Sequence, residues 1–448
     1  MRRIAVALAI SFSARAAEAA CQRPADVGGF GGYDYAPATP KSFDGTNVRI
    51  WYVTTGPHAV NDATTRMDMV PDNVARAAVV GDDALAKYAK MGFVPPVSDG
   101  TCGGDSKLDI YLVHFTAADG DETAETCTSV GKASKCSSFG LVEARMENAY
   151  GTFDLGARTV IPHELFHATQ DAYDQNVGRF WAEGSAQWAT KKIDPTVMDL
   201  EAFLPAFFKS AGTSIDISTG GVTGQFIYGS AIWPVFLDEH VGQDTIRAGL
   251  EQEGMLGAPS MDAISAALDA AGTSLADQYP TFMAWNAATG SRAGTGGYKS
   301  AKTYPTLDLT AFPDTNEVKA IATGFSAFFY SFDFSDPLQL VLEGDPTRVG
   351  ARAFPLDENG KASLDKLTAL PAVFTGPGVV IVTGISSKKT DAPFTLKAIT
   401  PPVADAGADA GTTPPPPMSG GCSCNQSSAT GAPSAILLAL ALLRKRRR

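Results

Sequence analysis

Histidine is scarce in this chain, with five residues among 448, and cysteine and tryptophan are similarly sparse at six and five. Positive charge is also in short supply, since 36 Lys and Arg stand against 48 Asp and Glu for a formal net charge of −12. The basic residues are concentrated at the two ends, so the body between them is more acidic still. This deficit excludes nucleic-acid binding as the main function, because that requires a basic footprint. The acidic, 44% apolar chain suits an exported protein with a large core and two domains.

Two of the five histidines stand in segment 161–167, which reads IPHELFH. Residues four positions apart share one face of a helix, so the imidazoles of His163 and His167 can both reach a single Zn²⁺. Glu164, between them, can take a proton from water activated by the metal. This spacing rarely arises by chance among so few histidines. That disfavours the alternative, an exposed helical turn with two surface histidines.

A possible third ligand is Glu183, which follows His167 after fifteen intervening residues in segment 180–188, FWAEGSAQW. A catalytic zinc usually takes three protein ligands and leaves its fourth position to water. A helix, a short loop and a second helix would return Glu183 to the metal, and its aromatic neighbours would exclude bulk water. One alternative is a solvated carboxylate at a helix start. Another is ligation by Asp171 or Asp174, but these are so close to His167 that they are more apt to point elsewhere or to end the helix.

The two segments together resemble the gluzincin metallopeptidases, in which the third zinc ligand is a Glu on the next helix, often within a Glu-Gly-x-Ala pattern. The resemblance implies a thermolysin-like zincin fold, zinc bound by His163, His167 and Glu183, and Glu164 as general base. The sequence departs from thermolysin-type enzymes in one respect. The Asp expected soon after the third ligand, where it orients a zinc-bound histidine, is missing, and Gln187 is the nearest substitute.

Gluzincins also use a Tyr or His to stabilise the tetrahedral oxyanion. Segment 228–233, YGSAIW, resembles the aromatic-plus-Gly start of the helix after the ligand pair in several such families. The resemblance places the oxyanion role on Tyr228, with His240 as an alternative. The competing interpretation of Tyr228 is a core aromatic residue with a satisfied hydroxyl.

The N-terminus has the three parts of a signal peptide over residues 1–20: a basic start, an apolar stretch and a small-x-small cleavage site. In an exported protein, cysteines are expected to form disulfides. The four cysteines of the first domain allow three pairings. The polar loop between Cys127 and Cys136 favours a local pair, which leaves Cys21 with Cys102.

Alternating strand and helix patterns over residues 21–299 predict an α+β catalytic domain. Its expected strands are 48–54, 108–115 and 139–146, and its expected helices are 72–91, 202–208, 232–239, 245–250 and 261–271. Pro162 fits the first turn of the zinc helix, where its missing N–H has no consequence. In gluzincins an edge strand just upstream of that helix, here 139–146, pairs with the substrate backbone.

From about residue 300 the pattern changes to short strands divided by Gly, Pro and Asp. The expected strands are 318–323, 327–334, 338–343 and 377–383. Near-regular short strands over residues 300–400 predict a β-sandwich accessory domain. No titratable cluster of catalytic type occurs in this part of the sequence.

Residues 401–420 form a linker rich in Pro, Ala, Gly and Thr, too poor in apolar residues to fold. The tail, 421–448, combines a Cys pair, a short apolar run and a basic end, and it resembles the MYXO-CTERM sorting tail of myxobacterial exported proteins. That resemblance implies removal of the tail by a sorting protease and attachment to the outer membrane or cell surface through a Cys-linked lipid. A single acyl chain binds membranes weakly, so some protein would be released to the medium. The alternative is a weak membrane anchor, since the apolar run is shorter than the roughly 20 residues of a stable span.

These patterns predict an exported, monomeric zinc metalloendopeptidase with protein or peptide substrates and with membrane contact only through its tail or a Cys-linked lipid. Zn²⁺ would polarise the scissile carbonyl, and Glu164 would pass a proton from water to the leaving amine. The alternative is a cell-surface binding or adhesion protein with a vestigial site. The intact Glu164 argues against it, because a degenerate site has no need of the base.

Overall fold

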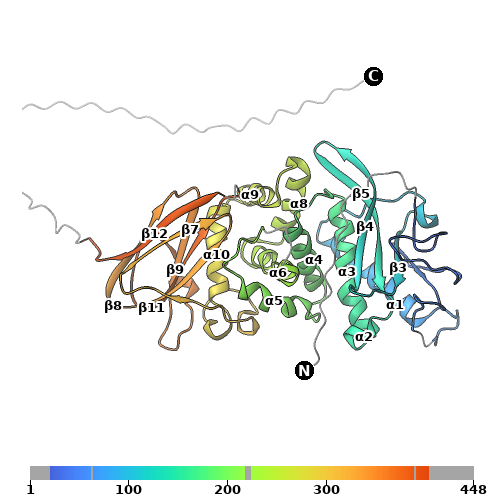
Figure 1. Ribbon diagram of the computed structural model, residues 1–448, viewed down its shortest axis with the longest axis horizontal. Coiled ribbons are helices and arrows are strands. Elements are labelled where there is room, and N and C mark those ends of the chain that lie inside the picture. Colours follow the sequence, from blue (N-terminus) through green and yellow to red (C-terminus); the bar gives the residue numbers. More distant parts are fainter. Residues whose placement is uncertain (1–20, 62–63, 217–222, 388–389, 403–448) are drawn as a thin grey trace, which may run out of the picture. The chain divides into compact units, whose positions relative to one another are not determined.

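The computed structural model describes residues 21–61, 64–216, 223–387 and 390–402. The predicted signal peptide (1–20) and sorting tail (421–448) lie outside the described residues, as does nearly all of the linker. The described part is a mixed α+β protein with two sheets (Figure 1). The predicted α+β class is confirmed.

The first sheet contains, within the described residues, five strands. Their order is β1 (Lys41–Asp44), β2 (Val48–Tyr52), β3 (Leu108–Val113), β5 (Ala133–Glu143) and β4 (Gly120–Val130). Strands β2, β3 and β5 run parallel, whereas β1 and β4 are antiparallel to their neighbours. The strands predicted at 48–54 and 108–115 correspond to β2 and β3, whose apolar side chains are buried.

The strand predicted at 139–146 corresponds to the end of β5, but its predicted position at the sheet edge is wrong. Strand β5 begins earlier, at Ala133, and lies between β3 and β4, so the edge strand is β4. The sequence of β4, GDETAETCTSV, is polar and lacks a strong apolar alternation. A strand that pairs on one side only, with most side chains at least partly exposed, needs no such pattern, which is why it was missed.

Helix α3 (Phe153–Asp171) carries the two histidines and packs against β4, β5 and α1 (Asp72–Lys90). The helix predicted at 72–91 corresponds to α1. Pro162, however, lies inside α3 and not in its first turn. The helix begins after Thr152, whose hydroxyl accepts a hydrogen bond from the Leu155 N–H, and α2 (Glu147–Tyr150) precedes it. Burial of most α3 side chains compensates for the hydrogen bond that Pro162 cannot make.

A helical region follows α3. It comprises α4 (Arg179–Ile193), α5 (Asp199–Lys209), α6 (Thr223–Gly229), α7 (Ile232–Phe236) with a π-helical turn at Leu237–Val241, α8 (Asp244–Leu256), α9 (Ser260–Ala270) and α10 (Leu275–Ala287). The four helices predicted between 202 and 271 correspond to α5, α7, α8 and α9. Helix α10 was missed because its second half is buried on all sides and therefore shows no amphipathic stripe.

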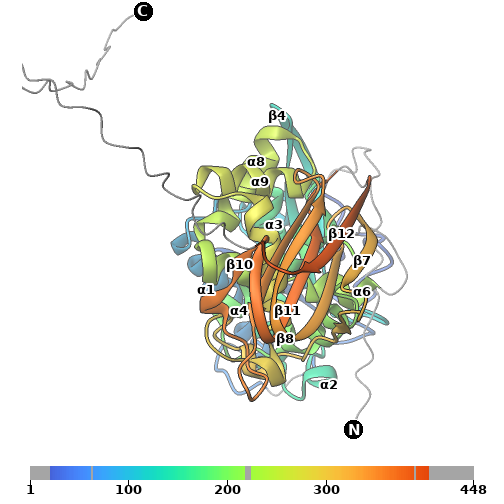
Figure 2. The same cartoon turned by 90° about the vertical axis from the view of Figure 1, so that its left-hand side faces the viewer.

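The second sheet lies in residues 310–399 and is antiparallel apart from β6 (Thr310–Ala311), which pairs in parallel with β8 (Figure 2). Its order is β10 (Thr368–Ala369), β9 (Val349–Pro355), β11 (Ala372–Gly384), β8 (Ala327–Gly344), β12 (Asp391–Ile399) and β7 (Glu317–Thr323). The sequence predicts two strands, 327–334 and 338–343, where the structure has the single strand β8. The intervening residues lie where the pairing of β8 with β11 shifts register.

The second sheet is sandwich-like. Residues 327–340 of β8 pair with β11, apart from the register shift, and residues 339–344 pair with β12. The sheet has a core of its own that includes Phe332 and Leu396. It also packs against α10, where the Tyr279 hydroxyl donates to the Phe325 carbonyl at 2.6 Å and Ile381 joins the main core. The β-rich and helical regions therefore belong to one compact unit.

Two disulfides tie the N-terminal part of the chain, Cys21–Cys102 and Cys127–Cys136. The predicted pairing is confirmed. Structural disulfides persist in oxidising compartments, so they fit an extracellular or secreted protein. Among the described residues, no helix combines the length and the apolarity that crossing a bilayer requires.

Candidate metal centre and active site

Three metal-ligating side chains converge between α3 and α4. His163 Nε2 lies 3.1 Å from His167 Nε2 and 3.2 Å from Glu183 Oε2, and His167 Nε2 lies 3.5 Å from the same oxygen. Four-coordinate zinc with bonds of about 2.0–2.1 Å to nitrogen and oxygen places its donor atoms about 3.3 Å apart. The three donors already stand at the spacing of one face of such a tetrahedron. The residues therefore fit Zn²⁺.

Local sequence explains why the third ligand returns to the first two. The chain leaves α3 after Asp171 and starts α4 after Gly178, whose N–H donates to the Glu253 carboxylate and the Ser260 hydroxyl. Gly184 lets α4 approach the start of α7 closely, since a Cβ there would lie 2.9 Å from Ser230 Oγ. Helix α4 is thus fixed at its start and along its length, which holds Glu183 beside α3.

Amide side chains orient both imidazoles. His163 Nδ1 lies 3.1 Å from Gln187 Oε1, and His167 Nδ1 lies 2.8 Å from Gln170 Oε1. Amide oxygens only accept, so each Nδ1 carries a proton and each Nε2 faces the centre of the cluster. In the metal-free protein, protons on the Nε2 atoms make the hydrogen bonds within the cluster, and a bound metal would replace them.

Each amide is itself held by a further partner. Gln187 Nε2 donates to the Asp199 carboxylate, and Gln170 Nε2 donates to the Ala182 carbonyl and to Ser185 Oγ, both at 2.8 Å. Gln187 therefore occupies the place that the sequence analysis assigned to it as a substitute for the missing Asp. Gln170 and Asp199 were not anticipated, because neither belongs to a motif and Asp199 lies on α5.

The charges of the cluster are strongly coupled in the metal-free protein. Burial alone would raise the pKa of Glu183, but hydrogen bonds from His163 and His167 outweigh it and hold that pKa well below its usual range. Burial would lower the pKa of His167, yet the hydrogen bond and charge of Glu183 raise it to about 10. The negative charge of Glu183 that stabilises the proton on His167 would also stabilise a metal cation bound at the same place.

Glu164 lies next to the ligands but is not one of them. Its side chain is buried, and burial raises its pKa to about 7, while the charges of His163 and His167 act in the opposite direction. Strand β4 touches the carboxylate, since a Cβ on Gly120 would lie 2.3 Å from Glu164 Oε1. The carboxylate is therefore confined between α3 and the edge strand.

Tyr228, on α6, lies beside the cluster. Its ring centroid is 5.8 Å from that of His163, and it stacks on Phe203 at 4.9 Å. Burial, with the charges of Glu183 and Glu164, raises the pKa of its hydroxyl well above the usual value. His240 has different neighbours, because its ring contacts Phe236 and Trp285 at 5.0 Å each. The structure thus brings Tyr228, and not His240, to the ligands.

The alternative carboxylates do not join the described metal-binding cluster. Asp174 Oδ1 accepts from the backbone N–H groups of Ser134 and Asn176, so it caps local backbone. Asp171 is buried beside Glu122 of β4, and burial raises its pKa to about 7. Asp121 of β4 does lie near the ligands, and burial raises its pKa to about 6 against the charge of His167. No sequence pattern pointed to these acidic residues of β4.

Comparisons with known proteins add little to this geometry. No protein family matches the sequence, and no curated protein matches it. Salmonella Typhimurium PliG, a periplasmic lysozyme inhibitor of g-type lysozyme, is 10% identical with a TM-score of 0.14, over 20% of this chain and 98% of that one. Legionella pneumophila aminopeptidase A, solved in complex with aspartic acid, is 11% identical with a TM-score of 0.32, over 79% of this chain and 36% of that one. Likeness this weak carries no argument about fold or function.

Proposed function

We propose that this protein is an exported zinc-dependent metalloendopeptidase with a zincin-type active site. One observation carries the proposal: His163, His167 and Glu183 present three donor atoms at the spacing of a zinc tetrahedron, with the Glu164 carboxylate beside them. A catalytic zinc site of this kind has three protein ligands and one open position. When bound, Zn²⁺ supplies Lewis acidity and lowers the pKa of water at that position.

Glu164 holds and moves the proton. Its carboxylate is confined by Gly120 of β4, and burial brings its pKa near 7 in the metal-free protein. A group poised near the working pH can take a proton from water and return it to the leaving amine. A bound dication acts in the same direction as the charged imidazoles and favours the ionised, basic form of Glu164.

Tyr228 is the donor for the developing oxyanion. Its ring lies beside His163, and its hydroxyl stays protonated because burial and the nearby Glu183 and Glu164 raise its pKa. A neutral hydroxyl in a water-poor site stabilises negative charge that appears only in the transition state. The rings of Phe180, Trp181 and Trp188 are buried and anchor α4, which carries Glu183, in the core.

Replacing Glu164 tests the proposal directly. Zinc-loaded wild type should generate new peptides from a denatured protein mixture, and a chelator should abolish them. Glu164→Gln should keep about one zinc per chain yet lose at least about 10²-fold in turnover, because the base is not a ligand. Mass spectrometry of the peptides and elemental analysis of the same samples provide the readouts. A wild type that holds zinc without cleaving any protein would favour the surface-binding alternative.

Export and surface attachment form a second part of the proposal. The two disulfides support export, whereas the signal peptide and the tail rest on sequence alone. The surface-extracted protein should begin near Cys21 and have lost the apolar and basic end of the tail by cleavage near the Cys pair, with a lipid on Cys422 or Cys424. An intact mass that corresponds to an unmodified chain ending at Arg448 would contradict the sorting-tail interpretation.

A further inference from the structure

Strand β4 forms one wall of the candidate active site. A Cβ on Gly120 would lie 2.3 Å from Glu164 Oε1 and 2.6 Å from Val160 Cγ1, closer than any real Cβ contact. The backbone of β4 therefore lies directly against the carboxylate, and only glycine permits this approach. The position of β4 consequently fixes where the Glu164 carboxylate can lie.

The pairing of β4 is one-sided and divided: Gly120 to Ala124 pair continuously with β5, and Cys127 to Val130 pair with it again after a register shift. The strand lies at the edge of its sheet, pairs only with β5, and its pairing is interrupted by a register shift between Ala124 and Cys127. Its outer half, from Thr126 to Val130, is exposed. Edge strands with few apolar contacts open readily unless other contacts hold them.

One disulfide holds the outer half of β4. Cys127 and Cys136 face each other in the pairing of β4 with β5, and their sulfurs are bonded. This bond lies directly after the register shift, where the ladder of hydrogen bonds is interrupted. It therefore replaces pairing that the main chain does not supply at this point.

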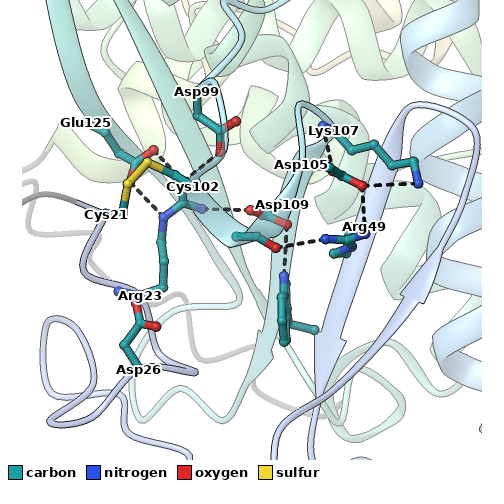
Figure 3. Close-up of polar contacts among 12 residues, drawn as sticks. Cys21, Arg23, Asp26, Arg49, Asp99, Cys102, Asp105, Lys107, Asp109 and Glu125 are labelled. Carbon is teal, nitrogen blue, oxygen red and sulfur yellow. Dashed lines mark hydrogen bonds and ion pairs between the residues drawn. A yellow bond between two sulfur atoms is a disulfide. The ribbon is translucent and has the colours of Figure 1, made fainter.

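The other disulfide holds the middle of β4 through Arg23. The Arg23 guanidinium, 1% exposed, donates from Nε and Nη2 to the two Glu125 carboxylate oxygens at 2.7 and 2.6 Å (Figure 3). It also contacts Asp99 at 2.9 Å and Asp109 at 3.2 Å. Cys21, two residues before Arg23, is bonded to Cys102, which follows Asp99 closely in sequence. The Cys21–Cys102 disulfide therefore ties the segment that carries Arg23 to the loop that carries Asp99.

We propose that formation of the two disulfides sets strand β4 against Glu164, so that the protein is a latent peptidase in a reducing compartment and becomes active once exported and oxidised. This inference rests on the proposed function and adds its regulation. The metal ligands lie on α3 and α4 and not on β4, so reduction affects the position of the base and spares the metal. Thiol–disulfide exchange with cellular dithiols keeps the four cysteines as thiols before export. After export, exchange with a disulfide-bonded oxidoreductase forms each bond, and the oxidant's own disulfide takes up two electrons and two protons and becomes a dithiol.

A pair of glycine variants tests the contact with the base. Gly120→Ala places a methyl group on the Glu164 carboxylate and should lower kcat by about 10²-fold while zinc content stays unchanged. Gly140→Ala, on the neighbouring strand β5, is the matched control. A Cβ on Gly140 would lie 3.8 Å from the Ile110 side chain, which is an ordinary contact distance. Equal kcat in the two variants would overturn the role of β4.

Removing each disulfide tests the regulation in the full chain. Cys127→Ser with Cys136→Ser, and separately Cys21→Ser with Cys102→Ser, should lower kcat at least about tenfold and leave zinc bound. Glu125→Gln is a milder variant that removes the Arg23 pairing without touching a cysteine. Asp83→Asn is its control, since Asp83 pairs with Lys87 on α1 and not with β4.

Hydrogen exchange provides a readout that does not depend on catalysis. Amides of 120–130 should exchange at least about tenfold faster in the cysteine variants, and in wild type treated with a trialkylphosphine, while α3 keeps its protection. The phosphine is oxidised to its oxide as each disulfide becomes two thiols. Unchanged exchange, full kcat in the reduced protein, or loss of zinc together with kcat would each overturn the inference. An inactive oxidised wild type with the expected exchange pattern would instead reject the proposed peptidase function alone.

Discussion

The two walls of the candidate site are built in different ways. The helical wall, formed by α3 and α4, carries His163, His167 and Glu183, which stand in two short segments of sequence. The strand wall, formed by β4, carries no residue of any motif and contacts the site through Gly120. The helical wall supplies the chemical groups, and the strand wall fixes the position of one of them.

The difference follows from how each wall is held. Helical spacing alone brings His163 and His167 together, because residues four apart share a face. The strand wall depends on residues that are distant in the sequence. The Arg23 guanidinium pairs with Glu125, which is 102 residues away, and the Tyr150 hydroxyl donates to Asp119, next to Gly120. Local geometry is therefore enough for the two histidines, whereas Glu183 and the setting of the base need contacts from distant parts of the chain.

The largest effect is expected at the helical wall. Combined His163→Ala and His167→Ala substitutions should abolish zinc binding, from about one ion per chain to none, because one carboxylate cannot hold the metal alone. Elemental analysis after dialysis gives the answer. The double variant His58→Ala with His114→Ala is the control, since these histidines lie outside the cluster, where His58 Nδ1 accepts from the His114 backbone N–H at 3.0 Å. Zinc retained in the first double variant would contradict the assignment.

Tyr228→Phe tests the oxyanion donor on α6, whose ring lies beside His163. Its kcat should fall about 10²-fold with little change in KM, because the hydroxyl acts only as negative charge develops. Steady-state kinetics on a fluorogenic peptide measure both constants. His240→Phe should leave kcat nearly unchanged, given that His240 contacts Phe236 and Trp285 instead. The reverse pattern would move the oxyanion role to His240.

A smaller effect is expected from the amides behind the ligands. Gln187→Leu removes the acceptor for His163 Nδ1 and leaves the Asp199 carboxylate without its donor. Zinc affinity, measured by competition with a chelator, should weaken by about 10- to 100-fold. Gln278→Leu, on α10, is a control in which the lost side chain contacts Thr273 instead. Equal affinities in the two variants would show that the amide does not orient the imidazole.

The same contrast explains what the sequence could and could not predict. The ligand set, the base and the disulfide pairing could be proposed from spacing, because each depends on short segments or few cysteines. Gln170 and Asp199 could not, since their partners are set by the packing of α3, α4 and α5. Strand β4 was missed for a related reason. Its residues are polar, and it matters to the site because Gly120, which has no side chain, leaves space for the Glu164 carboxylate.

The fold shows the same limits in two elements. The Pro162 prediction failed because a proline in a well-packed helix is tolerated when burial compensates for the missing hydrogen bond. Helix α10 was missed because its second half is buried on all sides, so the sequence there carries no periodic signal. Both errors arise where tertiary contacts, rather than local preference, decide the structure.

The last prediction concerns Glu253, which holds Gly178 at the start of α4 and so supports the helical wall. Its carboxylate accepts from the Gly178 N–H at 3.2 Å and from the Ser260 hydroxyl, and burial raises its pKa from 4.5 to about 7. Because the folded pKa lies above the unfolded value, its contribution to stability is complete below about pH 4.5. That contribution is lost as pH rises through about 7.

Glu253→Gln should therefore change little near pH 4.5 but raise the free energy of unfolding at pH 8 by up to about 3 kcal/mol, because the amide has no charge to bury. Urea unfolding of wild type and variant at both pH values measures the difference. Glu251→Gln is the control on the same helix, where loss of a partly exposed ion pair with Arg247 should cost less than about 1 kcal/mol at either pH. A stability difference between Glu253→Gln and wild type that stays constant from pH 4.5 to 8 would show that Glu253 does not titrate in this range. The start of α4 would then be held equally firmly at both pH values.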